Sequence, residues 1–157
     1  MGRARVLICL ACLACASAPG RSALDDERSI ATALDDFHDA AARADEERYF
    51  AHFALSGAFL GTDATEQWDV AAFRAFAHPY FARGKAWAFH ATRRAIVVRG
   101  ETAWFDEDLA TDTLGPARGS GVLVLRDGRW LIEQYVLSIT VPNERFRDVR
   151  EMLERGR

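Results

Sequence analysis

The side chains best suited to acid–base chemistry lie in the stretch Trp104–Leu109, which has the sequence WFDEDL. Apolar and acidic residues alternate there as in a β-strand, so Glu107 shares one face with two apolar residues. A carboxylate among apolar neighbours either pairs with a basic group or has a raised pKa, and both arrangements are common in functional sites. Glu107 is therefore a candidate pocket or acid–base residue. The alternative is an ion pair at the rim with one of three arginines: Arg93, Arg94 or Arg118.

A second group of polar and aromatic side chains lies in the stretch Phe59–Trp68, FLGTDATEQW. Asp63 could act as a general base at the mouth of a pocket. It could also be a turn residue, because an Asp side chain readily accepts hydrogen bonds from nearby backbone amides. Trp68 could wall a pocket or close the core. We expect this stretch to be chiefly an architectural junction that also forms one wall of a cavity.

Three further residues on strand-like segments are candidate lining groups of a pocket: His90, Arg118 and Tyr135. For His90 the alternative is a packed, hydrogen-bonded residue, which is the commoner role of a single histidine on a strand. Metal binding would require ligands at suitable spacing, and no pair of histidines in the chain lies at helical ligand spacing or in a short cluster. We therefore expect no metal site and no cofactor.

The elements that must position these residues begin with helices. Apolar residues recur at helical spacing in three N-terminal segments. The first is predicted to begin at Ser29, and the second, capped by Asp45, to end at Gly57. Asp69 is predicted to cap the third. Pro79 lies inside that third segment and predicts a kink or a break, because proline removes one backbone donor and crowds the preceding turn.

From Ala86 onward the hydrophobic period changes from helical to strand-like. Four strands are predicted: Ala86–Val98, Thr102–Thr111, Arg118–Arg126 and Trp130–Thr140. Asp127 and Gly128 form a hairpin turn signal, so the strands are expected to form an antiparallel meander. A short strand, Ala58–Leu60, should pair at the sheet edge, and a terminal helix capped by Asn143 should follow the meander. Helices first and strands later define an α+β domain, and a twisted sheet packed on three helices leaves a cavity between the layers.

Length and charge limit the broad class of the protein. The chain has 157 residues, which suits a single domain, and half of them are hydrophobic, which suffices for an ordinary core. The formal net charge is -3, so composition gives no reason to expect a nucleic acid partner.

The N-terminus has the layout of a secretory signal peptide, with two arginines, a short apolar run and then small residues. We place the cleavage after Ala16, which makes 1–16 a signal peptide, 17–27 a linker and 28–155 the domain. All cysteines precede the predicted cut, so the mature chain would be exported without a disulfide, to the periplasm or the medium. A lipid anchor on Cys12 or Cys15 is the alternative, and only that form would reach a membrane.

The order of elements and three sequence motifs resemble one family. The motifs are FLGTDATEQW, AWFDEDL and the closing GVLVLRDGRWLIEQYVLSITVPNE. Together they resemble the SnoaL-like branch of the nuclear transport factor 2-like superfamily, which includes ketosteroid isomerases. The resemblance implies a cone-shaped α+β fold in which N-terminal helices pack on a curved antiparallel sheet and enclose a pocket. The isomerases' base position falls near Gly61–Asp63, where only Asp63 could serve, and their oxyanion pair has no match here. This departure argues against steroid isomerisation.

Two functional hypotheses from different classes follow. The first is an exported domain that binds a small hydrophobic ligand in the cavity between helices and sheet. The second is an enzyme of the isomerase, dehydratase or hydrolase type that uses Asp63 or Glu107 as its acid–base group.

Both hypotheses include a homodimer formed through the outer face of the sheet. Members of the superfamily often pair this way. Aromatic residues are also numerous on the predicted sheet, which predicts an uncovered apolar face that favours association: Trp87, Phe89, Trp104 and Trp130.

Overall fold

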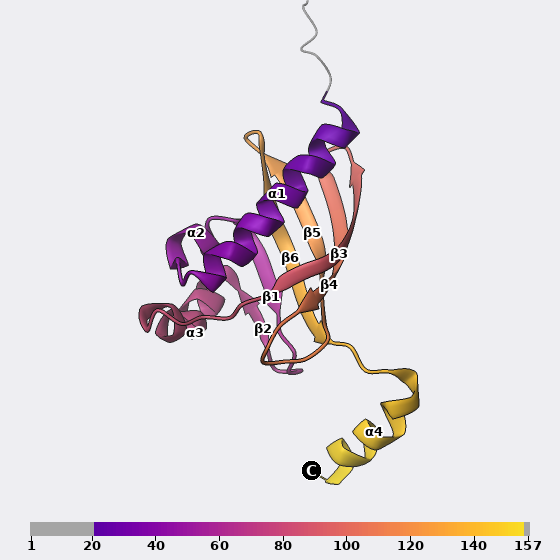
Figure 1. Ribbon diagram of the computed structural model, residues 1–157. Coiled ribbons are helices and arrows are strands. Elements are labelled where there is room, and N and C mark those ends of the chain that lie inside the picture. Colours follow the sequence, from indigo (N-terminus) through magenta and orange to yellow (C-terminus); the bar gives the residue numbers. More distant parts are fainter. Residues whose placement is uncertain (1–20, 156–157) are drawn as a thin grey trace, which may run out of the picture.

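A long helix lies across one face of a curved six-stranded sheet (Figure 1). The computed structural model describes residues 21–155, so the predicted signal peptide, its cleavage site and the three cysteines lie outside the described residues. In chain order the elements are α1 (Ala23–Ala42), α2 (Glu46–Phe50), β1 (Phe53–Leu60), β2 (Gln67–Asp69), α3 (Val70–Ala82), β3 (His90–Arg99), β4 (Thr102–Ala110), β5 (Ala117–Arg126), β6 (Arg129–Ile139), the 3-10 turn η1 (Asn143–Arg145) and α4 (Phe146–Arg155).

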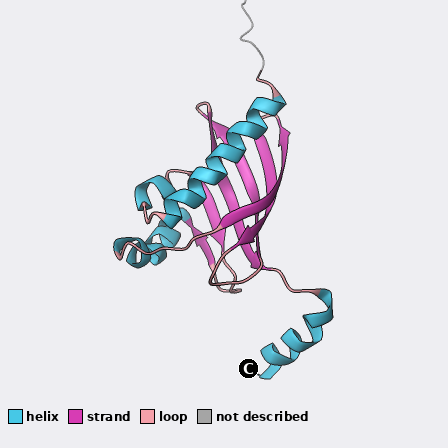
Figure 2. Cartoon of the chain, in the orientation of Figure 1, coloured by secondary structure: helices cyan, strands magenta, loops and turns pink. Residues whose placement is uncertain are grey.

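The sheet has the strand order β2-β1-β6-β5-β4-β3. Strands β3 to β6 form the predicted antiparallel meander, and helices α1 to α3 are gathered on one side of it (Figure 2), which confirms the α+β class. One pairing departs from the prediction, because β1 runs parallel to β6 and is not the edge strand. These two strands are separated in sequence by β2, α3 and the strands β3 to β5, so no hairpin fixes their relative direction.

Helix α1 begins earlier than the helical spacing predicts. Ser22 caps it by accepting a hydrogen bond from the Leu24 amide, so Ser29 is not the cap and residues 23–27 belong to the helix rather than to a linker. Asp26 in the first turn is buried and accepts a hydrogen bond from Trp130 Nε1 at 3.2 Å. The helix start is thereby tied to β6.

The second predicted helix proves too long. Asp45 caps α2 as expected, but α2 ends at Phe50, and the chain enters an eight-residue strand, β1, instead of continuing as helix to Gly57. Gly57 lies where β1 approaches β6: a Cβ there would be 2.9 Å from the carbonyl oxygens of both Ala54 and Ile132. This glycine therefore serves strand packing rather than helix termination.

Helix α3 is capped by Asp69, which accepts a hydrogen bond from the Ala72 amide at 2.8 Å, as predicted. The helix continues through Pro79 to Ala82, so the predicted break is absent. Pro79 lies exposed in the last turns, where water can bond the carbonyl that it leaves unpaired. Strand β3 begins at His90, not at Ala86, and the residues before it pack on the core without regular structure.

The C-terminal helix α4 extends away from the rest of the domain (Figure 1). Asn143 does not cap it, because a 3-10 turn without a side-chain cap precedes it. Phe146 and Leu153, on its predicted apolar stripe, are exposed. In the described part of the chain, no helix is long and apolar enough to cross a membrane.

Candidate functional site

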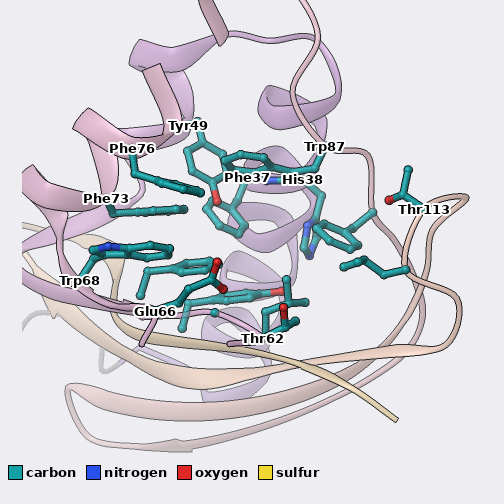
Figure 3. A pocket seen from close by; sticks show the side chains of 16 residues that line it. Phe37, His38, Tyr49, Thr62, Glu66, Trp68, Phe73, Phe76, Trp87 and Thr113 are labelled. Carbon is teal, nitrogen blue, oxygen red and sulfur yellow. The ribbon is translucent and has the colours of Figure 1, made fainter. Parts of the chain in front are cut away.

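A cavity of about 230 Å³ lies between the helices and the sheet (Figure 3). Nine of its sixteen lining residues are aromatic, which makes its wall largely apolar. They come from α1, α2, β1, β2, α3, β6 and the segment before β3: Phe37, Tyr49, Phe59, Trp68, Phe73, Phe76, Trp87, Phe89 and Tyr135. The remaining lining residues are His38, Gly61, Thr62, Glu66, Thr113, Leu114 and Leu137.

Several of the aromatic rings lie nearly parallel. The Phe59 ring is 4.0 Å from Phe73, with 14° between their planes, and 5.6 Å from Tyr135, with 5° between their planes. The Trp68 ring is 4.5 Å from Phe76 at 23°. Stacked rings favour further stacking by a flat molecule that inserts beside them. The wall is therefore suited to a planar apolar guest.

Directly behind the wall lies a buried carboxylate, Glu107, with three hydrogen-bond partners. His38 Nε2 is 2.7 Å from its Oε1, and the Tyr135 hydroxyl donates to the same oxygen at 3.0 Å. Arg94 Nε donates to Oε2 at 2.7 Å. Glu107 is fully buried, and each partner comes from a different element: α1, β6 and β3. Two of the three partners, His38 and Tyr135, line the cavity themselves.

The sheet register explains how this cluster forms. Glu107 lies on the inner face of β4, opposite Arg94 on β3 and Gly119 on β5. A Cβ at position 119 would overlap the Tyr135 hydroxyl and would lie 2.8 Å from Glu107 Oε1. Gly119 therefore leaves the space through which the phenol reaches the carboxylate.

The electrostatics of the cluster favour an ionised carboxylate. Burial acts to raise the pKa of Glu107, but the hydrogen bond and charge of His38 and the charge of Arg94 outweigh it, so the pKa lies below the ordinary value. Burial, together with the Glu107 charge, raises the pKa of Tyr135 well above the ordinary value. Tyr135 therefore remains a neutral donor at neutral pH.

Arg94 supplies the balancing positive charge. Burial acts to lower its pKa, but the charge of Glu107 and the bonds to Glu107 and Asp35 leave it raised. Its Nη1 also donates to the carbonyl of Ala31 at 3.0 Å and to Asp35 at 2.8 Å, which links β3 to α1. Nη2 is buried and has no hydrogen-bond partner among residues 21–155.

His38 connects the buried charge to the cavity. An ionised carboxylate can only accept a hydrogen bond, so the proton between the two groups belongs to His38 Nε2. In the neutral ring this leaves Nδ1 as an acceptor, and no group of residues 21–155 hydrogen-bonds to Nδ1. A buried histidine that lines a cavity and is oriented by a carboxylate has the arrangement of a general base.

The residues proposed from the sequence fall into two sets. Trp68 and Tyr135 line the cavity, and Glu107 lies directly behind it. Asp63 is exposed in a turn and accepts a hydrogen bond from the Thr65 amide at 2.8 Å. The structure thus brings three of the proposed residues together and places Asp63 outside the cavity lining.

His90 and Arg118 also lie outside the lining. His90 is exposed at the first position of β3. Arg118 alternates to the outer face of β5, where it lies opposite Asp108, with 3.7 Å between Nε and Oδ1. The ion pair that Glu107 forms is with Arg94, and it is buried rather than at the rim.

His38 was not among the site residues proposed from the sequence. The spacing between histidines does not reveal it, because its partner is a glutamate 69 residues away. A signal was present, because His38 follows Leu34 by four residues and so lies on the apolar stripe of α1. A polar residue on such a stripe needs a buried partner.

Metal ligands do not cluster in the described residues. No group of three or more His, Cys, Asp or Glu side chains between residues 21 and 155 is placed to hold a metal ion. The expectation that the protein uses no metal and no cofactor stays a prediction.

The family follows from comparison with known sequences. A sequence model of the SnoaL-like domain matches residues 30–142, and the chain belongs to this family. Among curated proteins, no sequence matches it.

Solved structures show the same fold at low sequence identity. A nuclear transport factor 2-like protein of unknown function from Pseudomonas putida KT2440 is 15% identical, with a TM-score of 0.65 over 80% of this chain and 93% of that chain. A candidate scytalone dehydratase from Novosphingobium aromaticivorans is 15% identical, with a TM-score of 0.63 over 75% and 86%. A candidate dehydratase from Streptomyces avermitilis is 13% identical, with a TM-score of 0.66 over 77% and 100%. These similarities establish a nuclear transport factor 2-like fold and leave the activity to the site.

Proposed function

We propose that the protein binds a small, flat, largely apolar molecule in the aromatic cavity. The observation that carries this proposal is the set of nearly parallel rings formed by Phe59, Trp68, Phe73 and Tyr135 along one wall. The cavity volume of about 230 Å³ lies below the roughly 300–1,000 Å³ of pockets for drug-sized ligands, which favours a compound of one or two rings.

A titration with 2-naphthol tests this proposal, with tryptophan fluorescence as the readout because Trp68 and Trp87 line the cavity. We expect saturable binding. Phe59→Leu should weaken it about two- to tenfold, because a stacked ring contributes roughly 0.5–1.5 kcal/mol beyond its buried area. Leu55→Ala is the matched control, since Leu55 is fully exposed and outside the lining. Equal affinity for cyclohexanol and 2-naphthol would contradict a site for flat molecules.

A second candidate function is acid–base catalysis, favoured by the 2.7 Å contact between His38 Nε2 and Glu107 Oε1. In this scheme His38 Nδ1 removes a proton from a carbon next to a carbonyl group, as isomerisation and dehydration require. Glu107 holds the ring in position and stabilises the imidazolium that forms. Glu107 is thus a positioning residue that acts through His38, and Asp63 has no part in the step.

Exchange of the α-protons of 2-tetralone in D₂O, followed by NMR, tests this chemistry on a flat ketone. The protein should accelerate the exchange, and His38→Gln should abolish the acceleration while 2-naphthol still binds. His78→Gln is the control, because His78 is exposed and bonded to Glu46. An acceleration that survives His38→Gln would exclude His38 as the base.

The proposal for localisation is export to the periplasm or the medium. It rests on the signal-peptide layout of the first residues. Intact mass spectrometry of protein from the native host tests it, with a mature start at Ser17 expected. A diacylglycerol mass on Cys12 or Cys15 would instead indicate a membrane-anchored form, and a full-length mass would contradict export. The expectation that no nucleic acid is bound stays a prediction.

We also propose a homodimer through the outer face of the sheet, but fewer aromatic residues support it than the sequence predicted. Trp87, Phe89 and Trp130 belong to the core or pack against it, so only Trp104 of the four predicted aromatics faces outward. Val97 and Val122 flank Trp104 in register on β3 and β5. This apolar row is the support for association.

A further inference from the structure

The connection between β1 and β2 brings one carboxylate into the wall of the aromatic cavity. Glu66 is half-buried and lines the cavity beside Gly61 and Thr62. The loop is fixed by backbone hydrogen bonds from Gly61 N to Glu66 O and from Glu66 N to Asp63 O, both at 2.9 Å. Figure 3 shows the Glu66 side chain among the aromatic rings.

The position of this carboxylate depends on Gly61. A Cβ at Gly61 would overlap Glu66 Oε2 and would lie 2.9 Å from Glu66 Cβ. The absent side chain lets the carboxylate fold over the strand end toward the cavity. Oε2 accepts a hydrogen bond from the Asp63 amide at 3.2 Å, and no group of residues 21–155 hydrogen-bonds to Oε1. One oxygen thus holds the side chain in place, and the other is free to bind a donor.

The charge of Glu66 has no counterpart at the cavity wall. The lining contains no arginine or lysine, and no basic side chain in the described part of the chain forms an ion pair with Glu66. The other nearby carboxylate, Glu107, is already balanced by Arg94. An anionic guest would face repulsion from Glu66, whereas a cationic guest would gain an ion pair.

The aromatic rings favour the same kind of guest. The face of an aromatic ring carries partial negative charge, and tryptophan attracts a cation most strongly. Trp68 lies two residues from Glu66, and Phe59 and Trp68 stack with 6.2 Å between their ring centroids. A carboxylate combined with aromatic walls is the chemistry by which proteins recognise ammonium groups.

We propose that Glu66 makes the cavity selective for a small aromatic amine, whose ammonium group pairs with the Glu66 carboxylate while its ring stacks inside the cavity. This inference rests on the proposed binding of small flat molecules and adds the charge of the ligand. It assigns the head of the ligand to the end of the cavity formed by Gly61, Thr62 and Glu66, and the apolar body to the stacked rings.

Three probes of similar size and different charge test the proposal: 2-phenylethylamine, 2-phenylethanol and 3-phenylpropionate. At neutral pH these carry one positive charge, no charge and one negative charge. We expect the amine to bind about five- to tenfold more tightly than the alcohol, and the propionate to bind most weakly. Higher salt should narrow the difference, because Glu66 is only half-buried and its ion pair is still partly screened.

Glu66→Gln is the matching variant, since its side-chain oxygen can still accept the bond from the Asp63 amide and keep the loop in place. The amine should lose its five- to tenfold advantage over the alcohol. Asp63→Asn is the control: Asp63 is an acid in the same loop that lies outside the lining, so its replacement should leave the amine preference intact.

The outcomes separate this inference from the function on which it rests. If alcohol and amine bind equally and Glu66→Gln changes neither affinity, the cavity binds small molecules but the proposed selectivity is wrong. If Asp63→Asn removes the preference as fully as Glu66→Gln, the general charge of the loop is responsible and Glu66 is not the determinant. If none of the probes and not even 2-naphthol binds, both the function and the inference are wrong.

Discussion

At the scale of single residues, the most consequential group is the fully buried carboxylate of Glu107. A buried charge is tolerated when hydrogen bonds and an opposite charge offset the loss of water. Here Arg94 supplies the opposite charge and bonds Oε2, and His38 and Tyr135 both hydrogen-bond to Oε1. The same arrangement that keeps Glu107 ionised fixes the orientation of His38, so stability and the proposed chemistry share one cluster.

Replacement of Glu107 by glutamine should therefore destabilise the domain strongly. The change removes the buried counter-ion of Arg94 and leaves it only the exposed carboxylate of Asp35, and loss of one partner from a buried pair typically costs about 3–5 kcal/mol. Urea denaturation measures the free energy of unfolding. Arg93→Gln is the control, because Arg93 pairs with Asp108 on the exposed face and should cost no more than about 1 kcal/mol. Equal losses in the two variants would contradict the assigned role of Glu107.

The lowered pKa of Glu107 also predicts a pH dependence. A carboxyl group whose pKa is lower in the folded state than in the unfolded state contributes stability above its unfolded pKa, near 4.3 for Glu. That contribution is lost as pH falls through the folded pKa. The free energy of unfolding should therefore decrease below about pH 5 more steeply for wild type than for Glu107→Gln. Parallel curves for the two proteins would contradict a lowered pKa.

At the scale of elements, the site depends on close contact between β4, β5 and β6. Glu107, Gly119 and Tyr135 come from these three strands, and the phenol reaches the carboxylate only because position 119 lacks a side chain. The sheet register, rather than any local motif, brings the groups together. A glycine on the inner face of β5 is therefore part of the site although it carries no functional group.

Gly119→Ala should displace the Tyr135 hydroxyl and cost about 1–3 kcal/mol, the usual cost of overpacking a core. Removing the hydroxyl with Tyr135→Phe should restore part of that loss, so the double variant should be more stable than the sum of the single changes predicts. Urea denaturation of the four proteins measures this coupling. Ser120→Ala, on the neighbouring residue, is the control. Strict additivity of the two free-energy changes would show that the overlap between a Cβ at position 119 and the Tyr135 hydroxyl is relieved by movement of other groups.

At the scale of the whole molecule, the sequence was informative where structure is local. The change of hydrophobic period near Ala86 predicted the α+β class, and Asp45 and Asp69 act as the helix caps that their residue types indicate. The parallel pairing of β1 with β6 depends on contacts between distant segments, for which a single sequence carries no signal.

The candidate site was predictable to a smaller extent. Strand alternation placed Glu107 on the inner face, but its partner His38 comes from α1, 69 residues away, and only the fold brings the two together. Asp63 was proposed from its position in a motif, whereas its carboxylate accepts hydrogen bonds from the amide and the hydroxyl of Thr65 within its own turn. The geometry of turns and the distances between elements decide which polar residues reach a cavity. Hydrophobic periodicity alone predicts neither the turn geometry nor those distances.

The proposed homodimer is the prediction that concerns the whole molecule. Trp104 is 46% exposed on the outer face of the sheet, between Val97 and Val122, and a second copy would cover this row. The wild-type protein should sediment as a dimer at micromolar concentration, and Trp104→Arg should shift it to the monomer, since a buried unpaired charge opposes association. Leu55→Arg is the control, because Leu55 is fully exposed on β1 and outside this row. A wild-type protein that stays monomeric at high micromolar concentration would contradict the homodimer. A Trp104→Arg variant that remains dimeric would show that the interface lies elsewhere.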